Sequence, residues 1–208
     1  MKYEEEAVLE ASADYIKTKN TVYLIGDSST MGYRENVKKF LSGVSNVVYP
    51  EENGRSSQYV ITMLRTWSGL CDAESVKVVQ FNTGHWDIAH WNDEDISLTS
   101  VDEYCKNILR ISESLKKMYK NAVIVFATTM PMNPNGENSV NYRYTREIKE
   151  YNEAAKRILK GKDVIINDLF GIAEHFTPLD YADYCHLTEK ANERIGLHCA
   201  SLYGSLLK

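Results

Sequence analysis

Residues 21–33 read TVYLIGDSSTMGY, and this segment decides the fold class. Five strand-forming residues run directly into the tripeptide Gly-Asp-Ser at 26–28, and a helix-like apolar pattern follows over 34–42. A short apolar run that ends in turn residues is typical of a buried parallel strand. The segment therefore predicts a strand, a sharp turn and a helix, in that order, as in an α/β domain.

Ser28 falls between the C-terminus of this strand and the N-terminus of the helix. In open α/β sheets ligands bind at that edge, where free backbone N–H groups and the helix dipole favour negative charge. A serine there can attack a carbonyl while its own N–H faces the oxyanion that forms. The alternative is a polar turn in which Asp27 or Ser28 caps the helix, because Gly-Asp-Ser is a common turn sequence.

Strands and helices alternate along the rest of the chain, which predicts a parallel sheet with right-handed crossovers. We expect a single α/β domain over residues 1–208, built as a three-layer α/β/α sandwich with a five-stranded parallel sheet, in which residues 1–20 form an N-terminal helical extension. The acidic, irregular segment 88–99 is expected to be a surface loop. Strands are expected at 21–25, 45–49, 76–81, 122–127 and 164–166, and helices at 3–19, 34–42, around 60–67, 100–118, 142–160 and from about 188.

Composition narrows the class of protein. The chain has 208 residues, of which 43% are hydrophobic, which suits one large domain with a substantial core. Its formal net charge of −5 argues against general nucleic-acid binding, which depends on Lys and Arg. No run approaches the roughly 20 apolar residues of a membrane helix, and residues 1–20 lack the features of a signal peptide, so we expect a cytoplasmic protein. Four cysteines show no Cys-x-x-Cys pair and are expected to be reduced and mostly buried: Cys71, Cys105, Cys185 and Cys199.

A second informative segment, DYCHLT at 183–188, comes directly before the last expected helix. Asp183 and His186 are three residues apart and so lie on the same side of one turn. A carboxylate placed in this way can accept the imidazole Nδ1–H, which leaves Nε2 to take a proton from a hydroxyl. Asp183 and His186 would supply the orienting carboxylate and the base that a serine nucleophile needs. The alternative is that both residues only cap the helix.

The order of these motifs resembles the SGNH (GDSL) hydrolase superfamily over about residues 21–200. The matching features are Gly-Asp-Ser after the first strand, Asn53-Gly54-Arg55-Ser56 after the second, a glycine loop after the third, and Asp183-x-x-His186 before the last helix. The resemblance implies a flavodoxin-like five-stranded parallel sheet between helices.

The resemblance also implies catalytic roles. Ser28 would be the nucleophile, His186 the base and Asp183 the residue that orients the base. Gly54 would supply a backbone N–H to the oxyanion hole beside the N–H of Ser28.

The third motif departs from the family pattern Gly-x-Asn-Asp, whose Asn side chain donates to the oxyanion. Here the residues are Gly84-His85-Trp86-Asp87, so Trp86 stands where Asn is expected. The indole has one donor and no acceptor, and losing an oxyanion donor typically costs about 2.7–4 kcal/mol. Three possibilities stay open: Trp86 donates, His85 donates, or two backbone N–H groups suffice. Trp86 could alternatively form a wall of the substrate cleft, and Asp87 is expected to anchor the loop by accepting backbone N–H bonds.

The loops at the strand ends supply the candidate substrate-binding residues. His90, Trp91 and Met130 are weaker candidates that ordinary loop positions explain equally well. His175 and His198 are interpreted as structural. The spacing of His85 and His90 matches no helical metal-binding pair, so neither a metal nor another cofactor is expected. The substrate-binding set is Asp27, Tyr33, Asn53, Arg55, His85 and Trp86.

Together these features predict a serine esterase that removes small acyl groups, acetyl foremost, from a polar or carbohydrate-like alcohol. The expected partner is a small-molecule or saccharide ester, without nucleic acid and without a membrane span. Two alternatives are a lipid or thioester acylhydrolase and a non-catalytic binding protein on the same fold. The sequence leaves open the natural ester, hydrolysis versus acyl transfer, and the oligomeric state.

Overall fold

The computed structural model describes residues 20–92, 94–136 and 141–207. The helical extension expected over residues 1–20 lies almost entirely outside these ranges. The five-stranded sheet is parallel throughout, in the order β2-β1-β3-β5-β7, which is the expected flavodoxin-like order for five strands that alternate with helices. The strands are β1 (Thr21–Ile25), β2 (Asn46–Val48), β3 (Val76–Phe81), β5 (Val123–Ala127) and β7 (Val164–Asn167).

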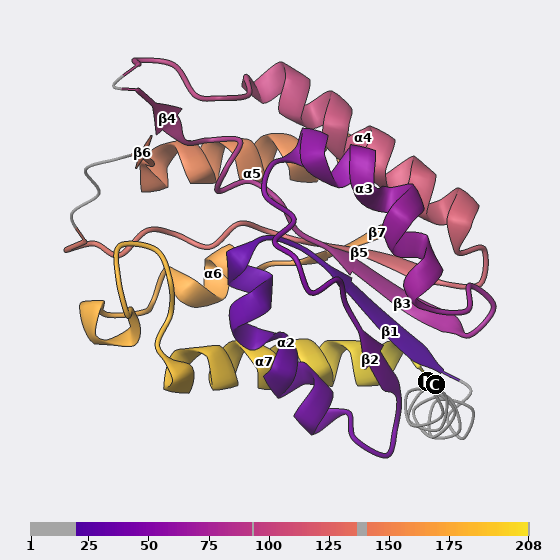
Figure 1. Ribbon diagram of the computed structural model, residues 1–208. Coiled ribbons are helices and arrows are strands. Elements are labelled where there is room, and N and C mark those ends of the chain that lie inside the picture. The colour runs from indigo at the N-terminus through magenta and orange to yellow at the C-terminus, as the bar shows by residue number, and fades with distance from the viewer. Residues whose placement is uncertain (1–19, 93, 137–140, 208) are drawn as a thin grey trace, which may run out of the picture.

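Helices cover both faces of this sheet and make the expected three layers (Figure 1). Three lie on one face and two on the other, with the short α6 beside the ends of the strands. In the described part of the chain, every helix is too short or too polar to cross a membrane. The first face carries α3 (Ser57–Trp67), α4 (Val101–Met118) and α5 (Thr145–Leu159); the second carries α2 (Ser28–Phe40) and α7 (Glu189–Leu206); α6 is Leu169–Ala173, and Ser68–Leu70 and Pro178–Asp180 are 3-10 turns.

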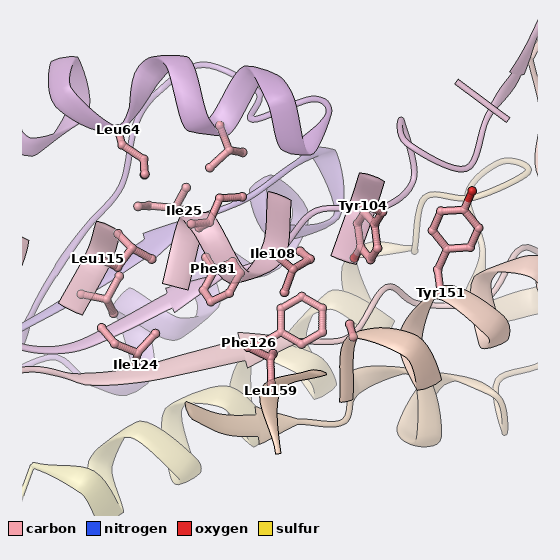
Figure 2. Close-up of a cluster of buried hydrophobic side chains, with 14 of the residues drawn as sticks. Ile25, Leu64, Phe81, Tyr104, Ile108, Leu115, Ile124, Phe126, Tyr151 and Leu159 are labelled. Carbon is pink, nitrogen blue, oxygen red and sulfur yellow. The ribbon is translucent and has the colours of Figure 1, made fainter. Parts of the chain in front are cut away.

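Alternating strand residues divide the core between the two faces. Ile25 of β1 points toward α3 and α4, while its neighbour Leu24 belongs to the cluster under α2 and α7. Figure 2 shows Ile25, Phe81 and Phe126 facing the apolar stripe of α4, whose Ile108 is fully buried. Each such side chain contributes about 1.5–3 kcal/mol through its removal from water.

Helices α2 and α7 pack side by side beneath the sheet, and glycine permits this close approach (Figure 1). A Cβ atom on Gly196 of α7 would lie 2.4 Å from Asn36 Cβ of α2, and one on Gly32 would lie 2.7 Å from Asn192 Oδ1. Because α2 begins at Ser28 and α7 begins three residues after His186, their packing brings both helix N-termini to the same edge of the sheet.

Three local features differ from the sequence prediction. The helix expected over 34–42 begins at Ser28, because the Asp27 side chain accepts the Ser29 N–H at 2.9 Å and caps it. The expected loop 88–99 contains β4 (His90–Trp91), which pairs antiparallel with β6 (Asn141–Tyr142). As a consequence α5 begins at Thr145, not at residue 142.

The cysteines are all free thiols, as expected, although only two of the four are fully buried. Cys185 and Cys199 are buried, while Cys71 and Cys105 are partly exposed. Burial raises the pKa of Cys199 to about 11.

The packing of α2 on α7 predicts that Gly196→Ala is destabilising by about 1–3 kcal/mol, because the new methyl group meets the α2 backbone and Asn36. Urea unfolding followed by circular dichroism measures this change. Gly204→Ala is the matched control on the same helix, since its Cβ would lie 3.7 Å from Leu41 Cδ2, an ordinary contact. Equal effects of the two substitutions would contradict the proposed close approach.

Candidate active site

Ser28 occupies the turn between β1 and α2 that the sequence predicts. It is the first residue of a 13-residue helix, where the backbone N–H has no intrahelical acceptor and the helix dipole is positive. Gly26 makes the turn possible, because a Cβ atom there would lie 2.1 Å from Thr30 Oγ1. The partly exposed Ser28 hydroxyl therefore stands at the C-terminal edge of the sheet beside a region of positive potential.

The structure brings Ser28, His186 and Asp183 into one chain of hydrogen bonds. His186 Nε2 lies 2.9 Å from Ser28 Oγ, and His186 Nδ1 lies 2.7 Å from Asp183 Oδ2. Since an ionised carboxylate only accepts hydrogen bonds, this network assigns the proton to Nδ1 and the lone pair to Nε2. The imidazole is thus oriented to take the serine proton.

Asp183 is fixed by the turn in which it lies. Its Oδ1 accepts the backbone N–H groups of Cys185 at 2.8 Å and His186 at 2.7 Å. Burial acts in the opposite direction, but these bonds and the bond from the His186 ring hold the pKa of Asp183 below its usual value. Asp183 therefore stays ionised opposite Nδ1 at neutral pH.

The loop after β5 supports this turn from behind. Asn133 Nδ2 donates to the Asp183 carbonyl at 3.0 Å, and the Asn133 N–H donates to the Tyr184 carbonyl at 2.9 Å. The Ala182 N–H closes the turn on the His186 carbonyl at 2.8 Å. The orientation of His186 consequently depends on main-chain bonds from two separate segments.

Asp87 anchors the third motif, as the sequence suggests. It accepts the backbone N–H of Ser57 at 2.9 Å, the Ser57 hydroxyl at 2.5 Å and the Thr83 hydroxyl at 2.9 Å. Because Ser57 begins α3, this fully buried carboxylate ties the loop after β3 to the start of that helix.

The expected oxyanion role of Gly54 does not fit its backbone. The Gly54 N–H donates to the Gly26 carbonyl at 2.9 Å, so it is already engaged inside the protein. The predicted substrate residue Asn53 accepts the Arg55 N–H through its Oδ1 at 2.8 Å and supports the positive φ of 50° at Arg55. The Arg55 side chain is exposed, and its Cζ lies 4.7 Å from the centre of the Tyr59 ring.

Trp86 is partly exposed and lies against Trp91 of β4, with ring centres 5.5 Å apart and planes tilted by 39°. Among the described residues, none accepts a hydrogen bond from Trp86 Nε1. The position is therefore compatible both with an aromatic cleft wall and with a donor to the oxyanion.

His85 does not contact the cleft as predicted. Its side chain is 3% exposed, and neither ring nitrogen is accessible or bonded to another described residue. Burial, followed by the charges of Arg143 and His186, lowers the pKa of His85 to about 3. A neutral imidazole enclosed in this way cannot reach a substrate oxygen, which removes His85 from the candidate oxyanion donors in this conformation.

Two other predicted substrate residues are also buried beneath the site. Asp27 is fully buried and caps α2. Tyr33 is 1% exposed, and its hydroxyl lies 2.9 Å from Gln80 Nε2 and 3.1 Å from Thr30 Oγ1. Both therefore support the helix that carries Ser28 and do not line a cleft.

The weaker candidates, named from the loops and from isolated histidines, lie in different environments. Met130 is buried, and His90 Nε2 lies 2.8 Å from Glu147 Oε2. His175 is exposed, and His198 binds Asn167 at 2.9 Å. The Trp91 ring, by contrast, packs against Trp86 of the third motif.

Arg143 and Tyr184 were not predicted as site residues from the sequence. Arg143 follows β6 and donates to the His85 carbonyl, while Tyr184 lies with its ring 6.3 Å from that of His186. In the sequence Arg143 looks like one of several charged residues of an exposed helix, so no signal distinguished it. Within the described residues, one set of potential metal ligands occurs, and it coincides with the site: Asp183, Cys185 and His186, whose ligand atoms lie within 4.8 Å of one another.

Comparison with known proteins places the fold. No family model matches the sequence, and no curated protein matches it. Solved structures do match. A lipase/acylhydrolase from Enterococcus faecalis is 17% identical, with a TM-score of 0.70, over 89% of this chain and 96% of that chain.

Two further solved structures widen the range of chemistry found on this fold. A GDSL-like lipase from Bacteroides thetaiotaomicron is 15% identical, with a TM-score of 0.66, over 98% of this chain and 96% of that chain. An acetylxylan esterase from Geobacillus stearothermophilus is 17% identical, with a TM-score of 0.63, over 90% of this chain and 94% of that chain. The protein thus has the fold of the GDSL-type acylhydrolases, as the sequence motifs suggested.

Burial of neutral His85 predicts a pH-dependent stability. Between its usual pKa of 6.5 and its folded value of about 3, the unfolded chain binds a proton that the folded protein excludes. The free energy of unfolding therefore falls as the pH decreases, by about 2 kcal/mol between pH 7 and pH 5 from this residue. In urea unfolding at both pH values, His85→Gln should lose this part of the difference, whereas His175→Gln, at an exposed site, should retain it. An unchanged pH dependence in His85→Gln would contradict the burial of a neutral ring.

Proposed function

We propose that this protein is a serine ester hydrolase that removes small acyl groups, acetyl foremost, from a polar or carbohydrate-like alcohol. The observation that carries the proposal is the pair of distances at His186, 2.9 Å to Ser28 Oγ and 2.7 Å to Asp183 Oδ2. The fold shared with acylhydrolases and with an acetylxylan esterase supports the same reaction class.

In this mechanism Ser28 Oγ attacks the ester carbonyl while His186 Nε2 takes its proton. His186 then gives the proton to the departing alcohol, and a water molecule, activated by the same nitrogen, releases the acyl group from Ser28. Asp183 keeps the imidazole in the required tautomer and stabilises its charged form. General acid–base help of this kind contributes about 10²–10⁴-fold to the rate.

The oxyanion that forms when Ser28 attacks needs hydrogen-bond donors. The backbone N–H of Ser28, at the positive end of α2, is the first of these. Since the Gly54 N–H is engaged with Gly26, we assign the second donor to the indole N–H of Trp86. The Trp86–Trp91 pair would also offer a flat apolar surface for the ring of a sugar-like alcohol.

Ser28→Ala should lower kcat for 4-nitrophenyl acetate by at least about 10³-fold, because it removes the nucleophile. Release of 4-nitrophenolate measures the rate. Ser29→Ala is the matched control, since the neighbouring hydroxyl has no role in the reaction. A wild-type rate no higher than that of Ser28→Ala would rule out the esterase and favour a binding protein on this fold.

Trp86→Phe should lower kcat by about 10²–10³-fold with little change in KM, because it keeps the ring but removes the N–H donor. Steady-state kinetics on the same ester separate the two constants. Trp91→Phe serves as the control for the stacked pair. A raised KM with an unchanged kcat in Trp86→Phe would instead assign Trp86 to the cleft wall.

A further inference from the structure

Arg143 is a buried guanidinium beside the proposed catalytic residues. It follows directly after β6, and its side chain leaves that strand toward the third motif and the turn that carries His186. Its Nε donates to the His85 carbonyl, and its Nη1 lies 3.3 Å from Asn141 Oδ1 and 3.4 Å from the Tyr184 hydroxyl. The residue is only 8% exposed.

The acceptors around Arg143 are all neutral. In the described ranges of the chain, no carboxylate lies within ion-pair distance of its guanidinium, and no acceptor lies against Nη2. Buried arginines are normally paired, because removing the charge from water is costly. Arg34, which is 9% exposed, shows the usual solution, since its Nη2 binds Glu51 Oε2 at 2.7 Å.

The Tyr184 ring lies between the Arg143 guanidinium and the His186 ring. Arg143 Cζ lies 5.8 Å from the centre of the Tyr184 ring, and that ring lies 6.3 Å from the ring of His186. The charge reaches the surrounding groups: after the larger effect of burial, it lowers the pKa of His85. Asp27 is a fully buried carboxyl group whose pKa is raised by burial, while the charge of Arg143 is among the smaller effects that lower it.

We propose that Arg143 binds an anionic group of the substrate, a carboxylate foremost, so that the enzyme prefers negatively charged esters to neutral esters of the same shape. This inference rests on the proposed esterase function. Nη2 has no acceptor among the described residues, so it can donate a charge-assisted hydrogen bond to a carboxylate. The guanidinium also supplies the local attraction that an anion needs to approach a protein of net charge −5.

The anionic group can belong to the acyl part or to the alcohol part of the ester, and two substrate pairs distinguish these sources. Monoethyl succinate and ethyl succinamate differ in charge on the acyl side, and 4-acetoxybenzoate and 4-acetoxybenzamide differ on the alcohol side. Acid release by titration measures kcat/KM for each. Comparing each variant with wild type cancels the intrinsic reactivity of the esters.

Arg143→Met should reduce kcat/KM for the anion of one pair at least tenfold more than for its amide, and Arg143→Lys should recover part of that loss. The pair that responds identifies the side that carries the charge. Arg146→Met is the matched control, because it removes the same charge from an exposed position three residues further along the chain. Equal losses of kcat/KM for anion and amide in both pairs would show that Arg143 only holds the His85 loop in place, and would overturn the proposal.

A binding measurement covers a variant that fails to fold. In the wild type, either 4-hydroxybenzoate or succinate should bind at least tenfold more tightly than its corresponding amide. Added salt should weaken that binding. Calorimetry on the wild type measures this directly, because neither acid carries an ester that could be hydrolysed. If Ser28 hydrolyses the charged and the neutral esters equally well, the esterase function stands and only the role of Arg143 is overturned. If the protein binds the anions selectively but hydrolyses none of the esters, the esterase function is overturned and the anion site stands.

Discussion

The hydrogen bond between His186 Nε2 and Ser28 Oγ is the contact on which the functional site depends, and helix packing makes it possible. The two residues are 158 positions apart, yet each lies at or just before the start of a helix. Those two helices, α2 and α7, lie side by side under the sheet, held close by glycines that leave no room for a side chain. A change in their spacing would move the base away from the hydroxyl, so the stability of this layer and the chemistry of the site are linked.

The charge of each group around the site depends on its burial and on its hydrogen-bond partners. Asp183 accepts backbone N–H groups and faces an imidazole that would become charged in the proposed reaction. His85 is kept neutral by burial, and its carbonyl takes a hydrogen bond from Arg143. Arg143 is thus a buried cation with no described carboxylate within ion-pair distance of its guanidinium, which is why we propose an anionic group of the substrate as its partner.

Much of the fold could be predicted from the sequence, because the five apolar strands and the apolar stripe of α4 carry strong periodic signals. The order of Gly-Asp-Ser and Asp183-x-x-His186 along the chain, read through the family resemblance, predicted that Ser28, His186 and Asp183 lie together, and the hydrogen bonds at His186 join them. The start of α2 was missed because polar residues follow Ser28, and β4 and β6 were missed because two residues are too few to show alternation. Gly54, His85 and Tyr33 could not be judged from sequence, since hydrogen bonding and burial depend on residues from other elements.

The central claim is that the paired imidazole makes Ser28 a nucleophile, and covalent trapping tests it most directly. Intact-mass spectrometry after treatment with a fluorophosphonate should show a single adduct, and peptide mapping should place it on Ser28. The same treatment of His186→Ala should give labelling at least about 10²-fold slower, because the proton acceptor is absent. A wild-type protein that remains unlabelled, or is labelled no faster than His186→Ala, would contradict the account.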